Sequence, residues 1–160
     1  MKKLILIRHA KSSWEQNLSD HNRPLSSRGF KDAENVSREL LGQLKPNLVL
    51  SSDALRAKTT AEIFISTLGI SHEIFVLNHD LYDFSGNNLL SVIKNTSKSI
   101  NELLVFGHNN AITFFVNTYG NQYIDNVPTC GVAVIEFDID NWTDLKKGRT
   151  IKTVYPKGLL

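Results

Sequence analysis

With 160 residues, of which 41% are hydrophobic and 21% charged, the chain is long enough to bury a sizeable core and has the composition of a globular protein rather than a disordered one. Its net charge of +2 is too small to indicate a nucleic-acid partner, and no apolar run approaches the roughly 18 residues that a membrane span requires. The single cysteine, Cys130, excludes an internal disulfide and suits a reducing compartment, so we expect a cytoplasmic protein. The length and the absence of repeats and linkers indicate one domain over residues 1–160, and we expect a monomer.

The first predicted element is a wholly apolar strand, residues 4–7, of the kind found in the middle of a sheet that is covered on both faces. This apolar run is too short for a secretory signal, which needs roughly 7 to 15 such residues. The strand ends abruptly at Arg8 and His9, and a polar, irregular segment follows over residues 11–24. Two strongly polar side chains therefore stand at the end of a buried strand, where they add nothing to a core.

Two helices with a strand between them come next. A helix is predicted from about residue 26 to 44, with Ser26 as its N-cap. Its apolar positions at helical spacing are Phe30, Ala33, Leu40, Leu41 and Leu44. A short strand at residues 48–50 follows. The second helix runs from about residue 53 to 68 and ends at Gly69, which suits a left-handed C-cap.

The rest of the chain continues this alternation of strands and helices. The remaining predicted elements are a strand at 72–77, a weak helix at 87–95, a strand at 103–106, a helix at 111–118, and strands at 132–137 and 150–155. Strands that alternate with helices are typical of an α/β protein. We therefore expect a three-layer α/β/α fold with a largely parallel central sheet and antiparallel strands near the C-terminus.

Three polar segments each follow a predicted strand directly. They are Arg8-His9, Ser51 through Arg56, and Gly107-His108. Because parallel strands end at the same edge of a sheet, where α/β proteins bind ligands, we expect Arg8, His9, Arg56 and His108 to meet at one site. Two of these segments also open helices, whose N-terminal amide groups favour anions. The expected ligand is a phosphate.

Four segments of the sequence resemble those of the histidine phosphatase superfamily, the group that includes the phosphoglycerate mutases. They are LILIRHAKSS at 4–13, RPLSSRG at 23–29, SSDALRAKTTAE at 51–62 and FGHNN at 106–110, and they occur in the family's order. The short length and the Arg-Pro-Leu helix entry are most similar to the small, SixA-like branch of phosphohistidine phosphatases.

The resemblance implies a role for each polar residue at the expected site. His9 would be the nucleophile that attacks phosphorus and forms a phosphohistidine intermediate, which water then hydrolyses. It must be neutral to do so, and the positive charges of Arg8 and Arg56 should lower its pKa. Arg8, Arg56 and, by analogy with the small branch, Arg23 would bind the phosphoryl oxygens, and His108 would donate to the same oxygens.

The proton donor to the leaving group is expected after the third strand, where family members that act on alkyl phosphates carry a carboxylic acid. Asp80 is the candidate, with Asp83 behind it. If neither residue serves, substrates with good leaving groups, such as a phosphohistidine or an acyl phosphate, are favoured. Little chain remains between Arg56 and His108 to form a lid, so we expect an open site.

The predicted function is metal-independent hydrolysis of a phosphorylated substrate, with protein phosphohistidine as the first candidate. His21, His72 and His79 show no spacing typical of metal ligands, so we expect neither a metal nor another cofactor. Three alternatives stay open: a phosphatase of small phosphomonoesters, a phosphate-binding module without activity, and a metallohydrolase, which a chelator would inactivate. The expected partner is a phosphorylated protein or a small phosphorylated molecule, with no nucleic acid and no membrane.

Overall fold

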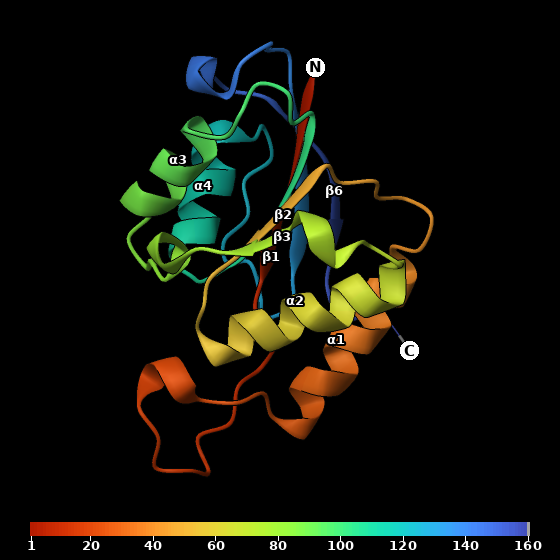
Figure 1. Cartoon of the computed structure of the whole chain (residues 1–160), viewed down its shortest axis with the longest axis vertical. Helices are drawn as coiled ribbons and strands as arrows, with labels where there is room; N and C mark the ends of the chain where they lie inside the picture. The colour runs from red at the N-terminus through yellow and green to blue at the C-terminus, as the bar shows by residue number, and fades with distance from the viewer. Residues whose placement is uncertain (160) are drawn as a thin grey trace.

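Six strands form one sheet in the computed structural model, which describes residues 1–159 (Figure 1). They are β1 (Lys2–Arg8), β2 (Leu48–Ser51), β3 (Phe75–Leu77), β4 (Glu102–Gly107), β5 (Val132–Phe137) and β6 (Arg149–Val154). Their order is β3-β2-β4-β1-β5-β6, with β1 to β4 parallel to one another and β5 antiparallel to both β1 and β6. The predicted α/β fold is therefore confirmed, including the antiparallel strands near the C-terminus.

Four α-helices within residues 1–159 cover the sheet in two pairs. They are α1 (Ser27–Glu39), α2 (Leu55–Leu68), α3 (Asn87–Lys94) and α4 (Ala111–Tyr119), and four short 3-10 helices join them: η1 (Asp20–Asn22), η2 (His72–Ile74), η3 (His79–Leu81) and η4 (Trp142–Asp144). One pair, α1 and α2, shares a buried cluster with one face of the sheet, and α3 and α4 share another with the opposite face (Figure 1).

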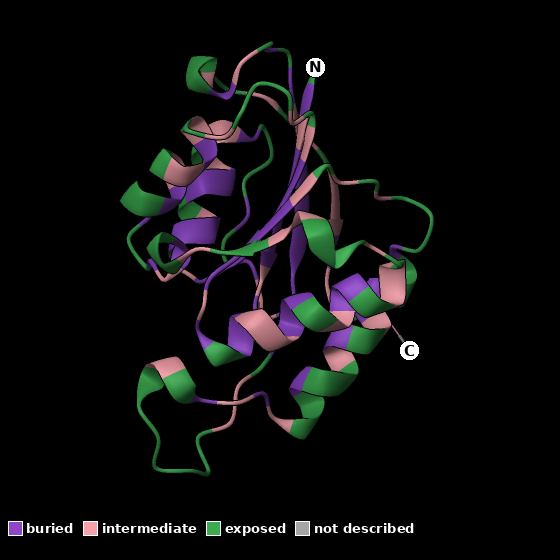
Figure 2. Cartoon of the chain, in the orientation of Figure 1, coloured by how far each residue is buried: buried purple, intermediate pink, exposed green. Residues whose placement is uncertain are grey.

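The central strand β1 contributes to both clusters because its side chains alternate between the two faces. Ile5 and Ile7 pack with α1 and α2, whereas Leu4 and Leu6 pack with α3 and α4, and all four are fully buried. Figure 2 shows the middle of the sheet buried between the two helix layers. This double burial explains why the strand reads as an uninterrupted apolar run.

The helix expected over residues 26–44 is shorter than predicted. Ser26 caps it as expected, accepting a hydrogen bond from the amide of Gly29 at 3.1 Å, but the helix ends at Glu39. Gly42 then adopts a φ of 76°, a left-handed conformation that turns the chain towards β2. Two residues of the expected apolar stripe are exposed: Phe30, which lies inside the helix, and Leu41, which lies beyond its end.

The strand expected at residues 72–77 is also shorter, because its first half forms η2 and only Phe75–Leu77 pairs with β2. The other predicted strands and helices are found within one or two residues of their expected ends. No helix among residues 1–159 is long and apolar enough to cross a membrane.

Candidate active site

His9 and His108 lie side by side because β1 and β4 pair in register. Arg8, the last residue of β1, is paired with Gly107, the last residue of β4, and the amide of His9 donates to the carbonyl of Gly107 at 3.1 Å. The residues that follow these strands therefore meet, and the centroids of the two imidazole rings are 5.1 Å apart. This is the convergence at strand ends that a parallel sheet predicts.

Arg56 reaches the two histidines from the first turn of α2, and its side chain is almost completely buried. Its Nε donates to Nε2 of His9 at 3.3 Å, and its Nη2 lies 3.5 Å from Nδ1 of His108. The guanidinium of Arg56 thus contacts both residues that directly follow β1 and β4.

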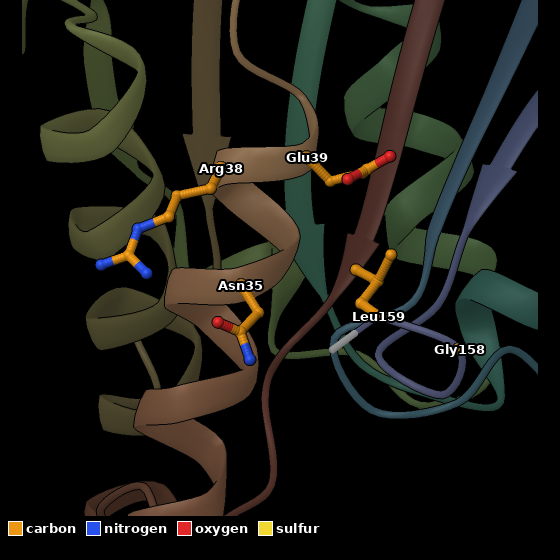
Figure 3. A pocket seen from close by; sticks show the side chains of 5 residues that line it. All are labelled: Asn35, Arg38, Glu39, Gly158 and Leu159. Atoms are coloured by element: carbon orange, nitrogen blue, oxygen red, sulfur yellow. The ribbon is translucent and has the colours of Figure 1, made fainter.

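A cavity of about 330 Å³ opens at this point of the molecule. Its walls are Arg8, His9, Lys11, Ser12, Trp14, Asp20, Arg23, Arg56, Phe84, His108, Asn109 and Thr129. All the residues expected to bind phosphate are among them. A larger hollow of about 480 Å³ lies between α1 and residues 158–159, but it gathers only Asn35, Arg38, Glu39, Gly158 and Leu159 (Figure 3). We place the candidate active site in the smaller cavity, where cationic and imidazole groups converge.

His9 is held in one tautomer and is neutral. Its Nδ1 lies 2.7 Å from the carbonyl oxygen of Ala10, which can only accept, so Nδ1 carries the proton and Nε2 keeps its lone pair. Burial lowers the pKa of His9, and the charges of Arg56, Arg8 and Arg23 act in the same direction, to a value of about 3. The nitrogen next to the cavity is therefore unprotonated at neutral pH.

His108 is buried beside it and is neutral for similar reasons. Its Nε2 lies 2.8 Å from Oγ of Ser52, the residue that follows β2. Burial, then the neighbouring His9 and Arg56, lower the pKa of His108 to about 2. An anion in the cavity would counteract these effects and favour a proton on His108.

Arg8 and Arg23 also line the cavity. Nη1 of Arg8 donates to the carbonyl of Val127 at 3.0 Å. The guanidinium of Arg23 stacks on Trp14, 3.5 Å from the ring centroid, and its Nη1 donates to Ser12 at 2.5 Å. The structure thus places Arg23 with the other two arginines, as expected from the resemblance.

Asp20 also lines the cavity, a position that was not expected from the sequence. Its Oδ2 accepts from Nη2 of Arg56 at 3.0 Å and from the hydroxyl of Tyr82 at 2.5 Å, and its Oδ1 accepts from Nη2 of Arg23 at 3.1 Å. Partial burial acts to raise its pKa, but the hydrogen bonds from Tyr82 and Arg56 and the nearby positive charge outweigh it and lower the pKa to about 2. The sequence contains a sign of the pairing with Arg23, because Asp20 precedes Arg23 by three residues, a spacing at which the two side chains form an ion pair here.

The structure corrects the expectation for Asp80 and Asp83. Asp80 does not line the cavity of His9; it follows β3 into η3 and borders a separate hollow, its amide held by the side chain of Asn78. Asp83 is buried and accepts from the amides of Gly86 and Leu89 at the start of α3. Asp83 therefore caps a helix, and neither carboxylate faces the phosphate site.

The polar segment over residues 11–24 is anchored to α1, which brings Asp20 and Arg23 into the site. The hydroxyl of Ser26 donates to the carbonyl of Lys11 at 3.0 Å. Gly29 lies so close to this carbonyl that a Cβ at position 29 would be 2.1 Å from its oxygen. The glycine of the RPLSSRG segment is thus required for the loop to approach the helix.

A second cluster of titratable groups lies just outside the cavity. His21, Asp53 and His79 offer three ligand atoms that all lie within 4.8 Å of one another. Sequence spacing alone had indicated no metal-ligand pattern for these histidines, because the three residues belong to separate segments of the chain.

Comparison with known proteins places the chain in a family. Residues 4–77 match the histidine phosphatase superfamily (branch 1). An uncharacterized chloroplastic protein of Arabidopsis thaliana, At3g52155, is 31% identical over 156 residues, which cover 89% of this chain and 70% of the relative. The chain belongs to the histidine phosphatase superfamily.

Solved structures agree with this assignment at the level of the fold. A SixA protein from Agrobacterium tumefaciens superimposes with a TM-score of 0.80 at 23% identity, covering 97% of this chain and 98% of the other. The protein histidine phosphatase SixA, solved with tungstate, gives a TM-score of 0.81 at 20% identity and covers 96% and 97%.

Proposed function

We propose that this protein is a phosphatase that uses His9 as a nucleophile, needs no metal in the chemical step, and acts on phosphohistidine carried by another protein. The observation that carries the proposal is the state of His9. A buried imidazole whose Nδ1 is fixed by a carbonyl, and whose pKa is about 3, offers an unprotonated Nε2 to a cavity lined by arginines.

The reaction would take place in two steps. First, the lone pair of His9 Nε2 forms a bond to phosphorus, and the bond from phosphorus to the substrate breaks, with its electron pair leaving on the substrate atom. Water then attacks the phosphorus of phosphorylated His9, phosphate is released, and His9 returns to its neutral form. Splitting the transfer in this way replaces one difficult step with two easier ones.

Arg8, Arg23 and Arg56 would hold the three phosphoryl oxygens through charge-assisted hydrogen bonds. His108 would donate to the same oxygens as charge develops, since a bound phosphate favours its protonated form. Donors of this kind contribute about 3 to 4 kcal/mol each to the stability of the transition state. In the present structure the carboxylate of Asp20 accepts from two of these guanidinium groups, and phosphate would take its place.

Within residues 1–159, the lack of a proton donor in the cavity favours phosphohistidine over an alkyl phosphate as the substrate. Among the described residues, Asp20 is the one carboxylate that lines the cavity, and it accepts from Arg23, Arg56 and Tyr82. A carboxylate that only accepts has no proton to give to a leaving group. The ring of a phosphohistidine can carry a proton on its other nitrogen and then leaves as neutral imidazole, whereas an alkoxide must receive its proton from an acid in the site. Phosphohistidine therefore suits this site better than an alkyl phosphate.

The rim of the cavity supports a protein as the carrier of the phosphate. Trp14 and Phe84 both line it, and their side chains are 77% and 45% exposed. Exposed aromatic side chains are enriched at protein interfaces.

Phosphate release from a phosphohistidine-bearing protein, an aryl phosphate and an alkyl phosphate, all in chelator, tests the proposal against the His9→Ala variant. We expect release from the first two substrates, little from the third, and none from the variant. Activity that survives in His9→Ala would overturn the assignment of the nucleophile. Phosphate binding without release from any substrate would instead favour a binding module.

A further inference from the structure

Three side chains outside the cavity converge on one point at the surface. Oδ1 of Asp53 lies 2.9 Å from Nε2 of His21 and 3.0 Å from Nδ1 of His79, and Oδ2 of Asp53 is also 3.0 Å from the latter nitrogen. His21 lies in η1, Asp53 precedes α2 and His79 begins η3, so three separate segments supply one donor each. None of the three residues has a part in the proposed phosphatase chemistry.

We propose that His21, Asp53 and His79 bind one Zn²⁺ ion. Two imidazole nitrogens and one carboxylate oxygen form a donor set typical of zinc sites, with ligand bonds of about 2.0 to 2.2 Å. Ligand atoms of a tetrahedral zinc ion are then about 3.4 Å apart. The separations of 2.9 to 3.0 Å between each nitrogen and the carboxylate are slightly shorter than this value, and the two imidazole nitrogens lie within 4.8 Å of each other, so modest movements of the side chains would reach that geometry.

The chemistry of the ligands favours a transition metal over magnesium or calcium. Imidazole is a good ligand for Zn²⁺, whereas Mg²⁺ and Ca²⁺ prefer oxygen ligands. With neutral imidazoles the cluster carries one negative charge. When the ion binds, each ring would carry its proton on its other nitrogen, so that the nitrogen next to Asp53 offers its lone pair to the metal. The side chain of His79 is 72% exposed, so the ion can reach the cluster from solvent, and water would complete its coordination.

The ring of Tyr82 packs against the imidazole rings of His21 and His79. Its ring lies edge-on to His21, with centroids 4.9 Å apart, and 5.8 Å from His79. These ring contacts restrict the orientations that the two imidazoles can adopt.

Bound zinc would fasten the loop over residues 11–24 to the body of the protein. His21 directly follows Asp20 and precedes Arg23, which both line the catalytic cavity, whereas Asp53 stands at the start of α2. The ion would thus act on the position of the loop and would not touch the reacting phosphate.

Calorimetric titration of the full, untagged chain with Zn²⁺ tests the proposal. We expect one ion per chain, and at least about tenfold weaker binding in His79→Ala and Asp53→Asn, since each removes a ligand. His72→Ala removes a histidine in η2, outside the cluster, and should bind as the unaltered protein does. His9→Ala should also bind equally, which separates this site from the catalytic histidines.

Two further measurements report on the coordination itself and on the loop. Co²⁺ in place of Zn²⁺ should give visible absorption bands that His79→Ala lacks, and Mg²⁺ should not compete. Zn²⁺ should also slow chymotryptic cleavage after the exposed Trp14. Equal Zn²⁺ affinity in the unaltered protein, His79→Ala and Asp53→Asn, or no stoichiometric binding, would overturn the proposal, whatever the outcome for phosphatase activity.

Discussion

Nη2 of Arg56 lies 3.0 Å from Oδ2 of Asp20, while Nε of the same guanidinium donates to His9. A carboxylate of the protein therefore accepts hydrogen bonds from a group that the proposed mechanism assigns to phosphate. Arg23 is shared in the same way. Asp20 and a phosphoryl group would compete for the same donors. The affinity of the site for phosphate therefore depends on how easily the carboxylate of Asp20 gives up its hydrogen bonds from Arg23 and Arg56.

Replacing Asp20 by Asn should strengthen inhibition by inorganic phosphate. The substitution removes the negative charge that offsets Arg23 and Arg56 but keeps the shape of the side chain. Because the side chain of Asp20 is 44% exposed, we expect an effect of about 1 kcal/mol, or about a fivefold lower inhibition constant. Asp140→Asn, beyond the opposite end of the sheet, is the matched control. An unchanged inhibition constant in the Asp20 variant would mean that the carboxylate does not compete.

The strand-end residues could be predicted from the sequence because their positions follow from the fold. Buried apolar strands are easy to recognise, and parallel pairing brings the residues after β1 and β4 together. Asp20 could not be predicted in this way, since residues 11–24 have no apolar period. The same is true of the cluster of His21, Asp53 and His79, which exists only because η1 and η3 pack beside the start of α2.

Asp80 illustrates how a correctly predicted strand can still be followed by a candidate residue that lies away from the cavity. It follows β3 as expected, but β3 is an edge strand of the sheet, and two strands, β2 and β4, lie between it and β1. Its carboxylate borders a hollow with Asn78 and Ser91 instead of the cavity of His9. A position directly after a strand therefore predicts that a residue lies at the carboxyl ends of the strands, but it does not predict the direction of the side chain.

Substitution of Asp80 by Asn should accordingly leave catalysis almost unchanged. We expect kcat and KM for phosphohistidine and for an aryl phosphate to stay within about twofold of the unaltered protein, as is usual for exposed residues away from a site. Steady-state kinetics with both substrates checks this. A large loss of kcat would return Asp80 to the list of proton donors.

Replacing His9 by Gln should abolish formation of the covalent intermediate. Gln keeps polar atoms of similar reach but offers no nucleophilic nitrogen, and loss of a nucleophile lowers kcat by as much as about 10⁶-fold. Brief incubation with a radiolabelled phosphodonor, followed by alkaline denaturation, should leave acid-labile label on the unaltered protein and none on the variant. Label retained by His9→Gln would place the phosphoryl group on another residue.

The lowered pKa of His9 predicts that activity is not lost as the pH falls below 7. Since the pKa of His9 is lowered from 6.5 to about 3, the neutral nucleophile persists as the pH falls from 7 towards 4. We expect that kcat/KM for an aryl phosphate does not fall between pH 7 and pH 5, after correction for ionisation of the substrate, and that it rises if His108 takes up a proton when phosphate binds. A fall centred near pH 6.5 would show that His9 has an ordinary pKa.

The same lowered pKa values predict a loss of stability in acid. Below pH 6.5 the unfolded chain binds protons at His9 and His108, while the folded chain, in which their pKa values are about 3 and about 2, does not. Each unit of pH below 6.5 therefore costs up to about 1.4 kcal/mol for each histidine. Urea unfolding at pH 7 and pH 5 should show a difference on the order of 4 kcal/mol. In His108→Gln the difference should be about half as large, and equal slopes in the two proteins would contradict this account.

Replacing Gly29 by Ala should weaken both the fold and the site. A Cβ at this position would lie 2.1 Å from the carbonyl oxygen of Lys11, so either α1 or the loop over residues 11–24 must move. Overpacking of this kind costs about 1 to 3 kcal/mol in the free energy of unfolding. Because Lys11 also accepts from Ser26 at the start of α1, the displacement should reach Arg23 and raise KM more than it lowers kcat. Lys31→Ala, on the exposed face of the same helix, should change neither quantity; equal stability of the two variants would show that the loop can move at no cost.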